Sequence, residues 1–301
     1  MAKKATKLAK KKISKTDIWD QLPKWRDANS FRTPQFQFNC SVSDYSGQTN
    51  TKEVSLLKDR NFLDIYRKLT SDGSIQNIFE LGFFQGGMPL FLADMIKPKK
   101  IVAVDWNPPT ENLNSLIANS RLSTEINLIG NVDQANTAQI LKIVESHFGK
   151  EPLDLIIDDC SHYYELSKGC FEKLFGYLKP GGKYVIEDWG WTHWPGEPWQ
   201  SDKSHFHNKS SLSNLVFEIV MAFASRKDLI AHIEIPSWAC VVITRGSDLP
   251  HGEPLDLSKV INVAGGRYAK LIAPASSKVL FTKAVEFLKR RGFLASLGLS
   301  G

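Results

Sequence analysis

The stretch IIDDCSH, residues 156–162, places ionisable side chains of several kinds directly after an apolar run. Asp159, Cys160 and His162 offer the oxygen, sulfur and nitrogen ligands that a zinc ion accepts. Asp159 and His162 alone would suit an acid–base pair beside a different metal. The same residues could also be only the polar end of a strand. These three interpretations predict different functions, so the surrounding elements must decide among them.

The cysteine content argues against the zinc interpretation. Asp159, Cys160 and His162 are nearly consecutive, whereas zinc ligands are usually spaced more widely on at least one side. The four cysteines lie far apart and form no CxxC pair: Cys40, Cys160, Cys170 and Cys240. Such isolated cysteines are typical of reduced, mostly buried thiols, which predicts a cytoplasmic setting.

The composition is that of a globular protein. The 301 residues are 42% hydrophobic and 23% charged, which fits one large domain with additions or two small domains. No apolar run approaches about eighteen residues, so we expect no transmembrane helix. The N-terminus has no apolar core of the kind that secretory signals contain. We therefore predict no membrane association.

The N-terminal tail carries more positive charge than the net charge of the whole chain, which is +6. Its first fifteen residues, MAKKATKLAKKKISK, contain seven lysines and no acid. A basic tail can bind phosphate or an anionic surface. Because no arginine-rich face or RNA-binding motif follows it, we favour a solvated arm over a nucleic-acid partner.

Strands and helices alternate regularly through the middle of the chain. Continuous apolar runs, as expected for strands of a parallel sheet covered on both faces, lie at 76–82, 100–106, 125–130, 153–159 and 183–189. Segments with helical period lie at 52–73, 87–97, 110–120, 137–149 and 164–182. A further helix is expected at 211–225, a hairpin at 229–246 and a last helix at 276–292.

Five strand–helix units followed by a helix and a terminal antiparallel hairpin resemble the class I methyltransferase fold. The resemblance implies an α/β, Rossmann-like architecture with a mostly parallel seven-stranded sheet and helical additions at both ends. We expect a basic tail and irregular lead-in over 1–50, a methyltransferase domain over 51–250 and a helical extension over 251–301.

The loop ELGFFQGG after the first strand has the features of a nucleotide-binding turn. Gly82 permits a tight turn, and Gly86 lets the following helix begin close to a ligand. Asp105 ends the second strand 23 residues after Gly82, where an acid can accept hydrogen bonds from ribose hydroxyls. This spacing is common to NAD and S-adenosylmethionine sites, so it does not separate the two cofactors.

The resemblance to class I methyltransferases favours S-adenosylmethionine. Those enzymes commonly have an acid where Glu80 stands, facing a cofactor with an amino group and a sulfonium. A pyrophosphate would be repelled there. "LKPGGKYVIED" also resembles the turn and strand after their fourth helix. The same resemblance makes Asn131 and Asp133 candidates to bind the adenine amine. We also expect the Asp158 side chain to face the cofactor.

Two neighbouring strands each end in a pair of acids, Asp158-Asp159 and Glu187-Asp188. Because both ends lie at the same edge of the sheet, four carboxylates should converge. Like charges repel unless a cation or protons neutralise them, and hard oxygen ligands suit Mg²⁺, Ca²⁺ or Mn²⁺. Alternatively, one acid caps a helix, another binds the cofactor amine, and no metal is held.

Residues 75–200 resemble the magnesium-dependent sugar O-methyltransferases of macrolide biosynthesis, of the macrocin and mycinamicin type, and the related cephalosporin-hydroxylase-named group. The similarity rests on "DLIIDDCSHYYE" and "LKPGGKYVIEDWGWTHWPG". It implies that Asp159, Glu187 and Asp188 ligate Mg²⁺ and that His162 is the general base. Glycine is usual in that family at the position of Cys160.

The predicted function is therefore S-adenosylmethionine-dependent O-methylation of a small hydroxylated molecule, with a glycosylated natural product as the leading candidate. The aromatic loop after the acids, WGWTHWPGEPWQ, could be a substrate lid, with Trp191 and Trp194 contacting the acceptor, or a hydrophobic plug. The alternatives are an RNA methyltransferase that uses the lysine tail, a non-catalytic S-adenosylmethionine-binding module, and an NAD oxidoreductase.

Overall fold

The computed structural model describes residues 23–40 and 48–262. They belong to a compact unit that ends at Asn262. The lysine-rich tail and the helix expected at 276–292 lie outside the described residues.

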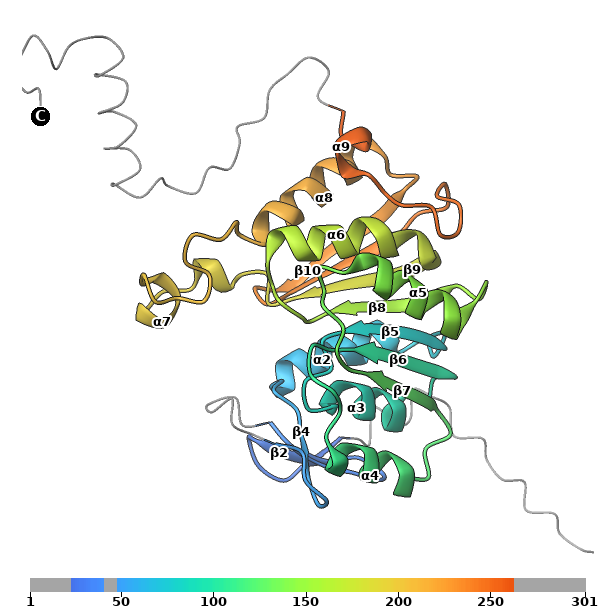
Figure 1. Cartoon of the computed structure of the whole chain (residues 1–301), viewed down its shortest axis with the longest axis vertical. Helices are drawn as coiled ribbons and strands as arrows, with labels where there is room; N and C mark the ends of the chain where they lie inside the picture. The colour runs from blue at the N-terminus through green and yellow to red at the C-terminus, as the bar shows by residue number, and fades with distance from the viewer. Residues whose placement is uncertain (1–22, 41–47, 263–301) are drawn as a thin grey trace, which may run out of the picture. The chain divides into compact units, whose positions relative to one another are not determined.

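A seven-stranded sheet forms the centre of this unit (Figure 1). Its order is β10-β11-β9-β8-β5-β6-β7. All neighbours pair in parallel except β11, which runs antiparallel to both β9 and β10. This topology confirms the predicted mostly parallel sheet with a terminal antiparallel hairpin. The strands are β5 (Asn77–Leu81), β6 (Lys100–Val104), β7 (Glu125–Ile129), β8 (Leu153–Asp158), β9 (Leu178–Glu187), β10 (Ile230–Ser237) and β11 (Cys240–Arg245).

Helices cover both faces of the sheet, and strand alternation decides which core each residue joins. Ile156 of β8 packs into the core beneath the later helices, whereas its neighbours Leu155 and Ile157 pack into the core beneath the earlier ones. The first face is covered by α5 (Thr137–Phe148), α6 (Tyr164–Leu174) and α8 (Ser213–Ser225). The second is covered by α2 (Arg60–Thr70), α3 (Gly87–Met95) and α4 (Glu111–Asn119).

The segment expected to be an irregular lead-in instead contains most of a small second sheet, which corrects that expectation. Its order is β1 (Lys24–Trp25), β2 (Ser30–Arg32), β3 (Gln37–Asn39) and β4 (Val54–Ser55). Phe31 and Phe38 stack with ring centroids 4.8 Å apart, and both meet Phe91 of α3 edge-on. Through this aromatic contact the small sheet packs into the second core.

The helix expected over 52–73 begins later, because Val54 and Ser55 pair with β3. Asp59 then caps α2 by accepting a hydrogen bond from the backbone N–H of Phe62. The connection between β4 and α2 is therefore short and fixed at both ends.

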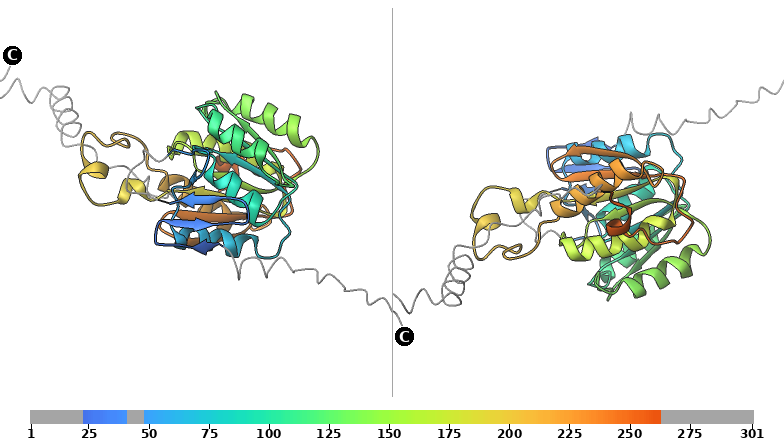
Figure 2. Two further views of the ribbon diagram at one scale, coloured as in Figure 1. Left: turned by 90° about the horizontal axis from the view of Figure 1, so that it is seen from below. Right: turned by 90° about the horizontal axis from the view of Figure 1, so that it is seen from above.

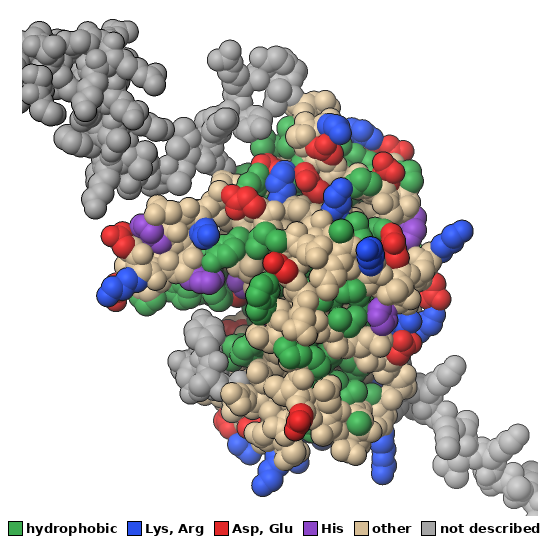
Figure 3. All heavy atoms as spheres, in the orientation of Figure 1, with side chains coloured by type: hydrophobic (Ala, Val, Ile, Leu, Met, Phe, Trp, Pro, Cys, Tyr) green, Lys and Arg blue, Asp and Glu red, His purple; other side chains and the backbone are tan. Residues whose placement is uncertain are grey.

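The remaining elements are short. They are the 3₁₀ turns η1 (Phe175–Tyr177) and η2 (Trp191–His193), with helices α7 (Glu197–Gln200) and α9 (Leu257–Val260). The segment with η2 and α7 stands away from the sheet in Figure 2, and histidine and hydrophobic side chains gather on it in Figure 3. Among the described residues, no helix has the length and apolar character needed to span a membrane.

Candidate active site

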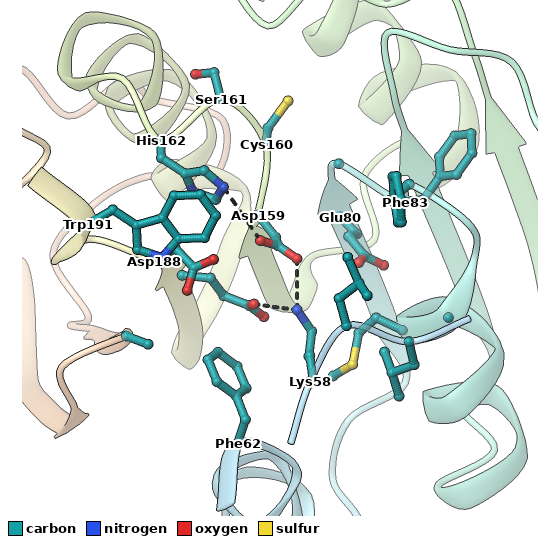
Figure 4. Close-up of a pocket in the computed structure, with 18 of the residues that line it drawn as sticks. Lys58, Phe62, Glu80, Phe83, Asp159, Cys160, Ser161, His162, Asp188 and Trp191 are labelled. Atoms are coloured by element: carbon teal, nitrogen blue, oxygen red, sulfur yellow. Dashed lines mark hydrogen bonds and ion pairs between the residues drawn. The ribbon is translucent and has the colours of Figure 1, made fainter. Parts of the chain in front are cut away.

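A cavity of about 1200 Å³ opens at the carboxyl ends of the central strands. Figure 4 shows its lining side chains converging from several elements. Most of the predicted site residues line it: Glu80, Gly82, Asp105, Asp133, Asp159, His162, Glu187, Asp188, Trp191 and Trp194. Gly86, Asn131 and Asp158 do not.

The glycine loop after β5 is built so tightly that side chains cannot be added. Gly82 has φ +88°, and a Cβ there would lie 2.0 Å from the carbonyl oxygen of Asp159. A Cβ on Gly87 would lie 2.4 Å from the carbonyl oxygen of Ser55. Gly86, at φ +77°, starts α3 without lining the cavity. The loop therefore packs directly against neighbouring backbone, and its residues 82–85 line the cavity.

Asp105 fixes the other side of this loop. Its Oδ2 accepts a hydrogen bond from the N–H of Phe84 at 2.8 Å, and its Oδ1 accepts one from the N–H of Asn107 at 2.9 Å. Each carboxylate oxygen has a second lone pair, so both can still accept from a ligand. Asp133, next along this edge, accepts from the N–H of Ala135, and its neighbour Asn131 lies outside the lining.

Glu80 is a buried acid whose carboxylate lacks partners. The residue is 0% exposed, and neither carboxylate oxygen has a hydrogen-bond partner among the described residues. Burial raises the pKa of its carboxyl well above the ordinary value. An acid left in this state on a cavity wall fits a cationic or hydrogen-bond-donating ligand group.

The placement of Asp158 does not support the predicted contact with the cofactor. Its carboxylate is 2% exposed and accepts a hydrogen bond from Nε2 of Gln134 at 3.0 Å. Burial raises its pKa to about 7. Gln134 does line the cavity, and its Oε1 accepts from the N–H of Ser161. Asp158 therefore does not line the cavity itself but positions Gln134, which does.

Asp159 and Glu187 share a buried ammonium that the sequence did not predict. Lys58 Nζ lies 2.7 Å from Oδ2 of Asp159 and 2.5 Å from Oε2 of Glu187. The hydroxyl of Tyr66 donates to Oε1 of Glu187. Burial raises the pKa of Glu187, and the ammonium opposes that shift. Each oxygen of Glu187 thus already accepts one hydrogen bond, and its predicted role as a metal ligand stays a prediction.

Asp159, His162 and Asp188 form the cluster that could hold a metal ion. They offer ligand atoms that all lie within 4.8 Å of one another. His162 and Asp188 both adopt left-handed backbone conformations, at φ 57° and 51°. Such conformations are uncommon for residues other than glycine and are enriched at functional sites. The N–H of Asp188 donates to the carbonyl of Ala239 at 2.6 Å, which fixes the turn after β9.

The electrostatics of this cluster follow from burial. Burial raises the pKa of Asp188 to about 7, and the nearby Asp159 adds to the shift. Burial lowers the pKa of His162 below its ordinary value, so its imidazole is neutral near pH 7 and can accept a proton. Cys160 also lines the cavity, but burial raises the pKa of its thiol, which disfavours the thiolate that zinc requires.

The aromatic loop contributes a wall beside His162. The ring centroids of His162 and Trp191 are 4.9 Å apart, and Trp191 in turn meets Trp194 at 5.5 Å. Trp194 meets Trp238 at 4.3 Å, from the turn between β10 and β11. Trp238 also lines the cavity and is 61% exposed.

Three residues at the site escaped the sequence-based prediction: Lys58 and Trp238, which line the cavity, and Tyr66, which bonds a lining residue. Lys58 and Tyr66 reach acids more than a hundred positions away. Trp238 is placed by the pairing of β11 with β9. For Trp238, the tight turn between the two strands of the predicted hairpin could have indicated its position near the site. Neither Lys58 nor Tyr66 belongs to a motif that could have done so.

Comparisons with known proteins agree with this geometry. Residues 79–189 match a family model described as a methyltransferase domain. Mycinamicin VI 2''-O-methyltransferase of Micromonospora griseorubida is 35% identical over 34% of this chain and 23% of its own length. Demethylmacrocin O-methyltransferase of Streptomyces fradiae is 39% identical over 28% of this chain and 19% of its own length.

Solved structures match as well, among them that of a methyltransferase. The MycE methyltransferase from the mycinamycin biosynthetic pathway, in complex with Mg, SAH and mycinamycin VI, has 21% sequence identity and a TM-score of 0.46. The match covers 64% of this chain and 51% of that one. The chain thus spans about a quarter or less of the two curated relatives' length. Residues 79–189 thus match a methyltransferase domain, and part of the chain is similar to two curated O-methyltransferases.

Proposed function

We propose that this protein is an S-adenosylmethionine-dependent O-methyltransferase that acts on a hydroxyl of a small glycosylated molecule and uses a bound divalent cation, Mg²⁺ by preference. The observation that carries the proposal is a single cavity. It is lined by Glu80, whose carboxylate has no partner among the described residues, by Asp105, and by the cluster of Asp159, His162 and Asp188.

The cofactor end suits S-adenosylmethionine better than a dinucleotide. The carboxylate of Glu80 would receive the cofactor's amino group, and Asp105 would accept from its ribose hydroxyls. Asp133 lies along the same wall for the adenine amine. A pyrophosphate would offer Glu80 neither a positive charge nor a hydrogen-bond donor, which disfavours NAD.

The reacting end provides a base and a place for a cation. When bound, S-adenosylmethionine supplies an electrophilic methyl group on sulfur. Asp159 and Asp188 would hold the divalent cation, whose positive charge would lower the pKa of the acceptor hydroxyl. His162 then accepts the hydroxyl proton on its ring nitrogen. The acceptor oxygen forms the new bond to the methyl carbon, and the sulfur keeps the electron pair of the broken bond.

We infer the class of acceptor from the volume of the cavity and from the side chains that line it. Sites for drug-sized ligands commonly measure about 300–1000 Å³, so a cavity of about 1200 Å³ has space for a cofactor and a second molecule. Trp191, Trp194 and Trp238 offer flat apolar faces beside His162, which suit the apolar face of a sugar ring. Two relatives are named for O-methylation in the mycinamicin and macrocin series.

The domain limits and location are also proposals. We propose that the methyltransferase domain covers 51–250, with the small sheet of the lead-in packed on it and 251–301 as an extension. We propose a cytoplasmic location. The four cysteines are free thiols in the structure, as a reducing compartment would require.

Calorimetry tests the cofactor assignment. The full chain should bind S-adenosylmethionine and S-adenosylhomocysteine and should not bind NAD. Glu80→Gln should weaken S-adenosylmethionine binding about tenfold or more, because the cofactor's ammonium would lose its carboxylate. Glu234→Gln, at an exposed position of β10, is the matched control. Binding of NAD alone would refute the proposal.

A further inference from the structure

The ammonium of Lys58 bridges two acids that line the cavity, Asp159 and Glu187. Its ammonium is 2.7 Å from Oδ2 of Asp159 and 2.5 Å from Oε2 of Glu187, shown by dashed lines in Figure 4. The Lys58 side chain is 8% exposed. A buried ion pair of this kind is hard to break, because removal of one partner leaves a buried charge uncompensated.

Glu187 is occupied on its other side as well. The Tyr66 hydroxyl donates to Oε1, and the Glu187 side chain is 1% exposed. Each of its two carboxylate oxygens thus already accepts a hydrogen bond from a protein donor. A metal ion that used Glu187 would have to displace the Lys58 ammonium or compete with it at close range.

Both donors come from the stretch that runs through β4 and α2, which lies outside the segment matched by the family model. The N–H of Lys58 donates to the carbonyl of Leu56 at 2.8 Å, and the Lys58 ammonium lies 5.0 Å from the centre of the Phe62 ring. The backbone bond and the cation–π contact hold the ammonium in place. The arrangement is therefore built into the fold.

The remaining acceptors lie on the opposite side of Asp159. Its Oδ1 is 4.0 Å from Nε2 of His162, and Asp188 completes the cluster. Mg²⁺ is usually held by one or two carboxylates and completes its shell with water and substrate oxygens. Asp159 and Asp188 satisfy that pattern without Glu187.

We propose that Lys58 is a positioning residue, an internal counter-ion that removes Glu187 from the metal-ligand set, so that a divalent cation is held by Asp159 and Asp188. This inference rests on the proposed function of the site. It departs from the ligand set expected from the resemblance, in which Glu187 was a third ligand. The Lys58 charge also lowers the affinity of the cluster for a cation, because it repels a second positive charge nearby.

The test measures Mn²⁺ binding to the full-length protein by electron paramagnetic resonance, with no cofactor or acceptor present. Asp188→Asn should weaken Mn²⁺ binding about 100-fold, because a ligand is lost. Lys58→Met should tighten it about tenfold, because a repelling charge is removed. Lys68→Met, an exposed lysine at the same cavity, should change it less than about twofold.

The charge-neutral double variant Lys58→Met/Glu187→Gln is decisive. It removes the ion pair without changing the net charge, so Mn²⁺ affinity should return to within about threefold of wild type. If Glu187 is a ligand, the double variant will bind Mn²⁺ about tenfold or more weakly than wild type, because the lost ligand outweighs the removed repulsion, and the inference is overturned. Unchanged affinity in a folded Lys58→Met variant, or no Mn²⁺ binding by wild type, also overturns it.

Two controls keep the outcomes separate. Thermal unfolding shows which variants are folded. Should Lys58→Met not fold, Glu187→Gln alone must weaken Mn²⁺ binding clearly less than Asp188→Asn, and equal losses overturn the inference. Methyl transfer is assayed on the same wild-type sample. Loss of Mn²⁺ binding by the double variant, together with methyl transfer by the wild type, refutes this inference and leaves the proposed function. The expected metal results without methyl transfer by the wild type refute the function.

Discussion

The imidazole of His162 rests against the indole of Trp191, with ring centroids 4.9 Å apart and planes inclined by 37°. The contact orients a neutral imidazole at the cavity wall, beside Asp159 and Asp188. It joins the residue proposed as the base to the loop proposed to hold the acceptor, so base and acceptor positions should change together.

Replacement of His162 by glutamine should abolish most turnover without weakening cofactor binding. Loss of a general base typically costs about 100- to 10,000-fold in rate. Turnover is measured as S-adenosylhomocysteine release and cofactor affinity by calorimetry. His232→Gln, at an exposed position of β10, should behave as wild type. Wild-type turnover in His162→Gln would remove the histidine from the mechanism.

Replacement of Trp191 tests the positioning of that base. Trp191→Phe keeps an aromatic face and should reduce kcat by only a few-fold, whereas Trp191→Ala removes the ring and should reduce kcat by about tenfold or more. The same assay also gives KM, which should rise if the indole contacts the acceptor. Equal kinetics for the two variants would show that the ring contact does not matter.

Gly82 is expected to tolerate no side chain. Gly82→Ala adds a Cβ that would lie 2.0 Å from a backbone oxygen at φ +88°. Gly181→Ala is the matched control, because Gly181 has φ +79° with nothing within 4 Å, so it carries only the backbone strain. We expect a loss of roughly 1–2 kcal/mol for the control and clearly more for Gly82→Ala, measured by urea unfolding. Equal losses would contradict the steric argument.

Asp158 should make stability depend on pH. Burial raises its folded-state pKa from 3.8 to about 7. Because the folded state holds the proton more tightly, the contribution of Asp158 to stability is full below about pH 4 and is lost as the pH rises to 7. Asp158→Asn keeps an oxygen that can accept from Gln134 and removes the titration.

The advantage of Asp158→Asn over wild type should therefore grow between pH 4 and pH 7, up to about 4 kcal/mol, and stay constant above that. Urea unfolding across this range, with EDTA present, measures the difference in the free energy of unfolding. A difference that does not change with pH would mean that Asp158 is ionised in the folded protein.

Most of the fold could be predicted because its strands are continuous apolar runs with helical periods between them. The convergence of Asp159, His162 and Asp188 followed from strand ends sharing one edge of the sheet. The small sheet could not be predicted, since its strands of two or three residues are too short to show alternation. The direction of the Asp158 side chain could not be predicted either. The alternation of side chains along a strand does not tell which face of the sheet borders the cavity.

The role of Lys58 was invisible in the sequence for a different reason. Its two acid partners lie 101 and 129 positions away along the chain. No local pattern marks a lysine before a helix as buried, and lysine is rarely buried without a partner. Only the docking of β4 and α2 against the strand ends shows that Glu187 is already paired.

The central claim is methyl transfer to oxygen, and the most direct measurement follows the methyl group itself. The full-length protein, Mg²⁺ and S-adenosylmethionine with a deuterated methyl group are incubated with glycosylated acceptors, including demethylated macrolides. We predict a deuterated O-methyl product by mass spectrometry and nuclear magnetic resonance, which is lost with EDTA and with His162→Gln. Bound cofactor with no labelled product, or label on nitrogen or carbon, would contradict the account.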